Sequence, residues 1–239
     1  MKKLVIIPTY NEIENISAMI DKVFSLEGDF NLLIIDDGSP DGTAKVVKER
    51  MSEFKDRLFI LERSGKLGLG SAYIAGFKWG LQQKYDYIFE MDCDFSHNPD
   101  DLINLYNSAI SGNDVVVGSR YVKGVNVVNW PMSRLLLSYF ASKYVRIVTR
   151  MKVKDATAGF VCYSREVLET IDLDAIQMNG YGFQIEMKYT ALRLGFKIGE
   201  VSIIFTERQE GASKMSGGII KEAVFGVMRL PLRKFIPKK

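Results

Sequence analysis

The segment LVIIPTYNE, residues 4–12, is an apolar run that passes directly into a polar loop. The same pattern recurs along the chain, where short apolar, β-branched runs alternate with longer amphipathic stretches. The predicted strands cover residues 4–7, 32–35, 58–61, 87–90 and 115–117, and the predicted helices lie near residues 12–26, 41–55, 70–83 and 99–111. Such alternation is typical of a mostly parallel sheet with helices on both faces. We therefore predict an α/β fold of this kind.

Length and composition narrow the class of protein. The chain has 239 residues, of which 47% are apolar and 26% are charged. This is ordinary globular usage, and it excludes a disordered chain and a disulfide scaffold. One α/β domain fits this length, and two small domains are the alternative. The formal net charge of +3 is too small for an obligate nucleic-acid binder, so we expect no nucleic-acid partner.

The sequence also indicates a compartment. Cys93 and Cys162 are far apart and match no metal-binding spacing, so we expect reduced thiols in a cytoplasmic protein. The apolar run after Lys3 is too short for a signal peptide. No run approaches the ~18 apolar residues of a membrane span. We expect a protein that is at most peripheral to a membrane.

Polar clusters follow four of the predicted strands. They are PTYNE (8–12), DDGSPDGT (36–43), MDCD (91–94) and GSR (118–120). Because ligands of open α/β sheets bind at the carboxyl ends of the strands, the clusters together predict one composite site. Ordinary turn chemistry is the alternative for any single cluster.

The sharpest motif is Asp92-Cys93-Asp94, which follows an apolar strand. In extended chain, residues i and i+2 point the same way, so we expect the two carboxylates to project together. Adjacent carboxylates repel each other unless a cation joins them. Mg²⁺ takes one or two carboxylates and completes its shell with water and phosphate oxygens. A solvated loop with two aspartates is the alternative.

Other nucleotide-binding motifs are absent from the sequence. There is no GxxxxGK[ST] phosphate loop, and the GxG at residues 68–70 lacks the third glycine of a dinucleotide fingerprint. We expect Asp36 to cap its turn and Asp37 to accept hydrogen bonds from a base or ribose, with capping as the alternative for Asp37. Glu12 either caps the first helix or binds the base edge.

Taken together, the motifs resemble those of the inverting glycosyltransferases of family two and, more closely, those of polyprenol-phosphate (dolichol-phosphate) mannose synthases. The matching segments are PTYNE (8–12), DDGSPDGT (36–43), GLGSAYIAGF (68–77), MDCDFSHNP (91–99), GSRY (118–121), VNWPMSR (128–134), DATAGF (155–160), GYGFQIEM (180–187) and FTERQEGASKMS (205–216). The first motif and D-x-D indicate only the superfamily, whereas the later segments indicate the polyprenol-phosphate branch.

The resemblance implies a Rossmann-like GT-A fold over residues 1–228, followed by a basic tail at 229–239. It implies GDP-mannose as donor, Mg²⁺ or Mn²⁺ as cofactor and a polyprenyl monophosphate as acceptor. The expected catalytic residues are Asp94, Arg120, Arg208 and Lys214; the expected substrate-binding residues are Pro8, Tyr10, Glu12, Asp37, Asp92, Cys93 and Arg134; and the expected metal ligands are Asp92 and Asp94. Two positions differ from many relatives: Cys93 replaces Ala, and Ser96 replaces Gln. The Ser96 hydroxyl can still reach a metal-bound water.

The chemistry of the acceptor predicts a mechanism. A phosphate is already an anion at neutral pH, so no strong base is needed. This agrees with a chain that contains one histidine, His97. His97 either contacts phosphate or is held by the backbone. Attack opposite the leaving diphosphate inverts the anomeric centre, while the metal and arginine neutralise the charge of the leaving group.

Two segments predict contact with a membrane. Residues 133–150 have the pattern of a basic amphipathic helix, and residues 229–239 add further bases among apolar residues. We expect them to hold the protein at the cytoplasmic face of a membrane, with a separate anchor subunit as a possible partner. A helix that faces the core with its basic side in solvent is the alternative. For the activity, the alternatives are a UDP-glucose-dependent glucosyltransferase and a non-catalytic, nucleotide-sugar-binding subunit.

Overall fold

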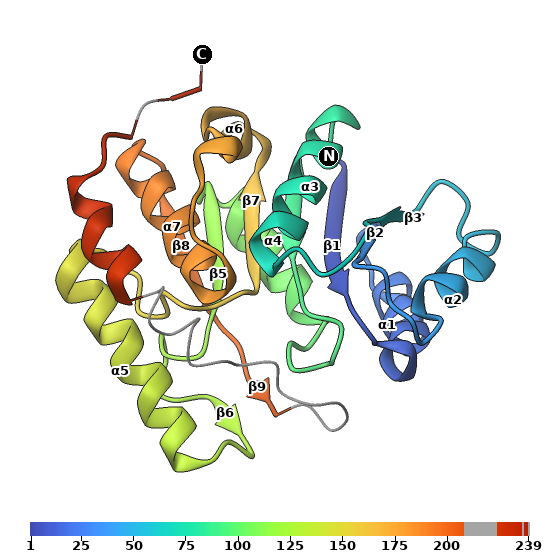
Figure 1. Ribbon diagram of the computed structural model, residues 1–239, viewed down its shortest axis with the longest axis horizontal. Coiled ribbons are helices and arrows are strands. Elements are labelled where there is room, and N and C mark those ends of the chain that lie inside the picture. The colour runs from blue at the N-terminus through green and yellow to red at the C-terminus, as the bar shows by residue number, and fades with distance from the viewer. Residues whose placement is uncertain (208–223, 236, 239) are drawn as a thin grey trace.

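A seven-stranded sheet organises the protein, with the strand order β3-β2-β1-β4-β7-β5-β8 (Figure 1). The strands are β1 (Lys3–Thr9), β2 (Phe30–Asp36), β3 (Leu58–Glu62), β4 (Tyr87–Glu90), β5 (Val115–Ser119), β7 (Val161–Ser164) and β8 (Ile198–Ser202). Neighbouring strands are parallel except β7, which is antiparallel to β4 and β5. The predicted, mostly parallel sheet is confirmed, and β7 and β8 add to the five predicted strands. This computed structural model describes residues 1–207, 224–235, 237 and 238.

Helices cover both faces of the sheet. They are α1 (Ile13–Ser25), α2 (Thr43–Arg50), α3 (Leu69–Gln82), α4 (Asp101–Ile110), α5 (Met132–Thr149), α6 (Arg165–Thr170) and α7 (Gly180–Arg193). Leu4 and Ile6 of β1 pack with α3 and α7 in one apolar cluster, whereas Val5 and Ile7 pack with α1 and α4 in another. Because both faces are covered, successive residues of β1 are apolar and fully buried.

Helix α3 lies unusually close to the sheet. A Cβ atom on Gly76 would lie 2.7 Å from Ile35 Cδ1 and 2.8 Å from Ile6 Cδ1. A side chain at residue 76 would fit only if the side chains of Ile6 and Ile35 moved aside in the close-packed core. Gly76, the last glycine of GLGSAYIAGF, therefore allows α3 to pack closely on β1 and β2.

A third apolar cluster joins α5, α7 and the C-terminal segment. Residues 224–229 are helical and lead into a short 3-10 helix, η2 (Leu230–Leu232). Val227 and Leu230 are buried in this cluster, and Phe235 meets Tyr189 edge to face, with ring centroids 5.3 Å apart. The described part of the predicted tail therefore packs on the protein, and one cluster spans the predicted boundary after residue 228.

A separate two-stranded sheet lies near the carboxyl edge. β6 (Val127–Val128) pairs in parallel with β9 (Phe205–Thr206). In Figure 1 these strands lie below the main sheet, beside the first turns of α5.

Candidate active site

A cavity of about 360 Å³ lies at the carboxyl ends of β4 and β5. Its polar lining includes Asp92, Asp94, Ser96, His97, Arg120 and Arg134, and its apolar lining includes Leu137, Phe140, Tyr144, Val145, Val224 and Val227. The fold thus brings four of the predicted site residues, two aspartates and two arginines, into one cavity. Its apolar wall comes from α5 and residues 224–227.

The two aspartates reach this cavity through a bend. Residues 93–96 form a bend rather than a continuation of β4, and Phe95 has a φ of 57°. As expected, both carboxylates project together into the cavity, although the chain bends here instead of continuing the strand. The Asp92 side chain is 41% exposed, whereas Asp94 is 8% exposed and accepts a hydrogen bond from the Ser96 N–H at 3.1 Å.

Cys93 lies on the other side of this bend. It is 3% exposed and packs in the apolar cluster with α1 and α4. The thiol of this predicted substrate-binding residue therefore belongs to the core. Any contact that Cys93 makes with substrate falls to its main chain.

The residues around Asp94 fit a divalent cation whose coordination shell is completed by water and by the oxygens of a bound phosphate. Among the described residues no group of three or more His, Cys, Asp or Glu side chains could hold a metal. Two carboxylates are enough for Mg²⁺ or Mn²⁺ when water and phosphate supply the other oxygens. The Ser96 Oγ is buried beside them and has no hydrogen-bond partner among the described residues. A buried hydroxyl without a partner favours a bound water or ligand at this point.

His97 is held by the backbone. The Asp92 N–H donates to its Nδ1 at 3.3 Å, and its ring stacks on Phe160 with centroids 5.0 Å apart. Burial lowers the pKa of His97 to about 4, so the imidazole is neutral at neutral pH. The backbone contact of the second predicted alternative is therefore present, and His97 also lines the cavity.

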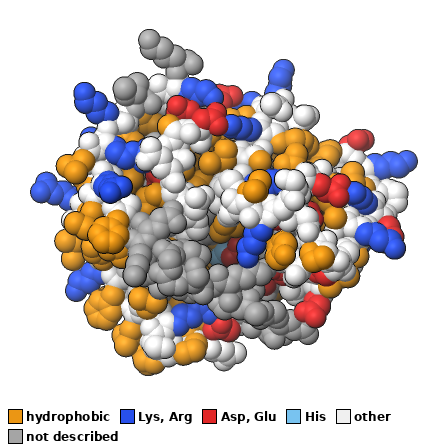
Figure 2. Space-filling model, in the orientation of Figure 1, with side chains coloured by type: hydrophobic (Ala, Val, Ile, Leu, Met, Phe, Trp, Pro, Cys, Tyr) orange, Lys and Arg blue, Asp and Glu red, His pale blue; other side chains and the backbone are white. Residues whose placement is uncertain are grey.

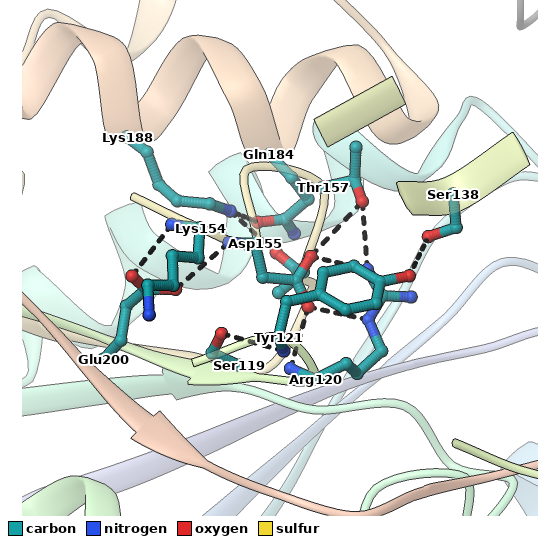
Figure 3. A network of polar contacts seen from close by, with 11 residues as sticks. Ser119, Arg120, Tyr121, Ser138, Lys154, Asp155, Thr157, Gln184, Lys188 and Glu200 are labelled. Atoms are coloured by element: carbon teal, nitrogen blue, oxygen red, sulfur yellow. Dashed lines mark hydrogen bonds and ion pairs between the residues drawn. The ribbon is translucent and has the colours of Figure 1, made fainter. Parts of the chain in front are cut away.

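Arg120 is clamped by an acid from a distant loop. The carboxylate of Asp155 is fully buried and accepts three hydrogen bonds from Arg120 (Figure 3). The donors are the backbone N–H at 2.9 Å and, in the side chain, Nε at 2.7 Å and Nη2 at 2.6 Å. Burial disfavours the charge of Arg120, but the Asp155 carboxylate outweighs this and raises the pKa of Arg120. The Glu200 carboxylate accepts the N–H groups of Lys154 and Asp155 at 2.8 and 3.0 Å and so fixes this loop. The sequence motif DATAGF contains Asp155, but its role was not predicted.

Arg134, on α5, also lines the cavity. It forms an ion pair with Glu207 and its guanidinium lies 4.3 Å from the centre of the Trp130 ring. Trp130 also lines the cavity, and its Nε1 is buried without a partner among the described residues. Arg208 and Lys214, the other two predicted phosphate contacts, lie outside the described residues.

The predicted nucleoside residues lie along the neighbouring edge, at the ends of β1 and β2. Asp36 caps its turn as predicted, since it accepts hydrogen bonds from Ser39 N and Thr9 Oγ1 at 2.9 and 3.0 Å. Both Asp37 oxygens are bound by Arg63, through Nε at 2.6 Å and Nη2 at 2.8 Å. Arg63 was not predicted, because nothing in the sequence links it to Asp37.

The other three predicted nucleoside residues lie at the end of β1 and in the loop that follows it. Pro8 pairs with Ile35 inside the sheet, and the Lys66 Nζ lies 5.2 Å from the centre of the Tyr10 ring. Glu12 occupies the N-cap position of α1 without capping it through its side chain. Its carboxylate accepts a hydrogen bond from Asn15 instead. None of these residues, nor Asp37, is among the described residues that line the 360 Å³ cavity.

Two ionisable residues are buried behind Asp92. Glu90, the last residue of β4, and Lys188, on α7, are both fully buried. Burial raises the pKa of Glu90 to about 8 and lowers that of Lys188 to about 8. The Lys188 Nζ donates to the Ala158 carbonyl at 2.7 Å and lies 3.5 Å from Gln184 Oε1. An acid at the end of the apolar strand YIFE was the only signal of this cluster in the sequence.

Known proteins resemble this chain at several levels. The sequence pattern of the family described as Glycosyl transferase family 2 matches residues 4–172. The chain is 46% identical over 232 residues to the polyprenol monophosphomannose synthase of Mycolicibacterium smegmatis, covering 97% of this chain and 88% of that protein. It is 47% identical over 229 residues to the undecaprenyl-phosphate mannosyltransferase of Micrococcus luteus, covering 96% of this chain and 93% of that protein.

Solved structures confirm the predicted GT-A fold. One is glucosyl-3-phosphoglycerate synthase from Mycobacterium tuberculosis in complex with Mn²⁺, UDP-glucose and phosphoglyceric acid, with a TM-score of 0.70, 19% identity and coverage of 96% of this chain and 79% of that one. Another is a mannosyltransferase from Pyrobaculum calidifontis in complex with GDP-Man and Mn²⁺, with a TM-score of 0.56, 15% identity and coverage of 97% and 70%. At such identities the likeness bears on the fold alone.

Proposed function

Because the chain belongs to glycosyl transferase family 2, we propose that it transfers mannose from GDP-mannose to a polyprenyl monophosphate. The observation that carries this proposal is the cavity, in which carboxylates and arginines share one space with an apolar wall. A lipid phosphate is a ligand with both of these chemistries. The two relatives at 46% and 47% identity bear names that describe transfer of this kind.

The donor diphosphate binds at Asp92 and Asp94 in this proposal. A divalent cation, Mg²⁺ or Mn²⁺, supplies the positive charge that the leaving diphosphate needs. Asp94 is the firmly placed ligand, since it is buried and accepts the Ser96 N–H. The Asp92 side chain is 41% exposed, so its carboxylate is accessible to the donor. Pro8, Tyr10, Glu12 and Asp37 hold the nucleoside along the adjacent edge, and the bound Mn²⁺ of the structural relatives supports this cofactor class.

The acceptor phosphate binds at Arg120 and Arg134. Arg120 keeps its charge because Asp155 pairs with it in the interior, and this salt bridge also fixes the direction of the guanidinium. The phosphate oxygen attacks the anomeric carbon from the side opposite the leaving group, so the anomeric centre inverts. The neutral His97 agrees with a reaction in which the nucleophile arrives already ionised. Arg208 and Lys214 are proposed as further phosphate contacts.

The prenyl chain of the acceptor lies against the apolar wall formed by α5 and residues 224–227. Among the described residues, no helix has the length and the apolar character that crossing a bilayer requires. We propose that α5 and the C-terminal segment rest on a membrane surface, because they carry exposed apolar residues such as Ile147 and Leu232. In Figure 2, apolar and basic side chains alternate on the left side of the molecule, where these elements lie.

Parallel transfer assays test this proposal. The purified protein is incubated with a short polyprenyl phosphate and either GDP-mannose or UDP-glucose, in Mg²⁺, in Mn²⁺ and in chelator. We expect mannosyl transfer that requires the metal and gives a product of inverted anomeric configuration by NMR. If only glucose is transferred, GDP-mannose is the wrong donor and the UDP-glucose-dependent alternative holds. If neither sugar is transferred, the proposal is wrong and the non-catalytic, nucleotide-sugar-binding alternative is favoured.

A further inference from the structure

A second cavity, of about 490 Å³, lies between the C-terminal ends of α5 and α7 and strand β8. It shares no lining residue with the first cavity. Four cationic side chains line it: Arg150, Lys152, Arg193 and Lys197. All four are exposed, so a ligand can reach them from solvent.

These cations have no carboxylate partner within the part of the chain that the structure describes. Glu200 is the one acid among the described lining residues, and its two oxygens accept the N–H groups of Lys154 and Asp155. Arg193 donates to the Tyr189 hydroxyl at 3.3 Å, which leaves its charge uncompensated. The cavity therefore gathers four positive charges around one acid that is already engaged.

Helix dipoles account for the positions of only two of these four cations. Arg150 and Arg193 lie at the C-terminal ends of α5 and α7, where cations are favourable. Lys152 and Lys197 lie outside both helices. Like charges that converge without a partner repel each other. The apolar lining residues Leu192 and Phe196 further limit water on one side, which strengthens electrostatic attraction to an anion.

We propose that this cavity is a second anion site, which binds the phosphate group of a ligand independently of the transfer reaction. The phosphate comes either from a soluble phosphate or from the headgroup of an anionic lipid. The lipid source is favoured by position, because Arg150 directly follows the last residue of α5 and lies three residues after Ile147, which is 69% exposed on the proposed membrane surface. The apolar lining then accommodates the first carbons of the lipid.

The test follows backbone amides of residues 150–153 and 195–198 by ¹H–¹⁵N NMR, in chelator to suppress metal-dependent binding at the first cavity. One arm adds inorganic pyrophosphate. The other adds dihexanoyl phosphatidylglycerol, with dihexanoyl phosphatidylcholine as the uncharged comparison. We expect saturable shifts at these residues in at least one arm, and the arm that responds identifies the source.

The variant Lys152→Gln/Lys197→Gln should bind about tenfold more weakly or worse, since each base near an anionic headgroup contributes ~1 kcal/mol. The matched control is Lys45→Gln/Lys55→Gln, which makes the same change of net charge at two exposed lysines of another surface. It should bind as the unmodified protein does. The proposal is wrong if neither probe shifts these amides, or if the Lys152/Lys197 variant binds as tightly as the control. Thermal unfolding of both variants checks that the fold is kept.

Discussion

The negative charge of Asp94 should determine the transfer rate, whereas the fold should tolerate an uncharged side chain of the same shape. We expect Asp94→Asn to lower the transfer rate by a factor of roughly a hundred to a thousand, because an amide cannot neutralise a hard cation, and one lost electrostatic contact of a transition state costs ~3–4 kcal/mol. The hydrogen bond from the Ser96 N–H to Oδ1 survives in the amide, so the thermal midpoint should change little. Initial rates and thermal unfolding measure the two effects. Asp56→Asn, at an exposed position with a φ of 60° that Asn tolerates, is the control.

Arg120 and Asp155 should behave as one unit. Breaking a buried ion pair from one side leaves an uncompensated charge and costs about 3–5 kcal/mol, whereas replacing both partners by apolar residues costs far less. We expect Asp155→Asn and Arg120→Met each to be strongly destabilised in urea. The double variant Arg120→Met/Asp155→Leu should regain much of that stability. Activity should be lost in all three, because each removes or misplaces the guanidinium. Additive losses of stability in the double variant would contradict the coupling.

Glu90 should make stability depend on pH. Burial raises its pKa from 4.5 to about 8, so between these values the folded protein keeps a proton that the unfolded chain releases. The stabilisation is complete below about pH 4.5 and is lost as the pH rises through 8, with a slope of up to about 1.4 kcal/mol per pH unit. Lys188 titrates above this window, since its pKa falls from 10.5 only to about 8. The free energy of unfolding is measured in urea at several pH values for the protein and for Glu90→Gln. Between pH 4.5 and 8 it should fall more steeply with pH in the unmodified protein. Equal slopes would refute the raised pKa of Glu90.

At the scale of elements, α5 and the C-terminal segment form the proposed membrane surface. Ile147 is 69% exposed and Leu232 is 84% exposed, and neither lines the first cavity. We expect the protein to sediment with vesicles that contain anionic lipid. Salt should weaken this binding, because charges are screened beyond about 10 Å at 0.1 M salt.

The variants for this surface are Ile147→Asp and Leu232→Asp. Both should reduce vesicle binding while leaving transfer to a short, soluble acceptor unchanged, since an exposed apolar side chain contributes to insertion and not to the core. Ile110→Asp, at a 48% exposed residue at the end of α4, is the matched control. Failure of the unmodified protein to bind anionic vesicles at low salt would favour a separate anchor subunit.

At the scale of the whole molecule, the sheet edge and α5 together define one acceptor site. If the prenyl chain lies on the apolar wall, kcat/KM should rise more than tenfold with each added isoprene unit until the wall is covered, because each buried CH₂ contributes ~0.8 kcal/mol. The dependence of kcat/KM on chain length is measured with acceptors of one to five isoprene units. Phe140→Ser, on the wall, should make it shallower without changing the KM for the donor. A rate independent of chain length would place the prenyl chain elsewhere.

Much of this architecture was accessible from the sequence because it rests on local patterns. The period of apolar residues predicted the five strands of the parallel core, and α1 to α4 lie within the predicted ranges except for one residue at the start of α3. The order of the motifs indicated the family, which the match over residues 4–172 confirms. The D-x-D was predicted at the right strand end with its two carboxylates together, as they are in the cavity, but the bend at residues 93–96 was not predicted.

What the sequence determined by itself is therefore the alternation of strands and helices, the family and the place of the polar loops, since each is encoded by neighbouring residues. Only the tertiary structure decided how the charges are paired. Arg63 binds Asp37 across 26 residues and Arg120 binds Asp155 across 35. It also decided that Cys93 faces the core and that Glu90 is buried beside Lys188. Such contacts depend on which segments pack together in space, and no local pattern of residues records that.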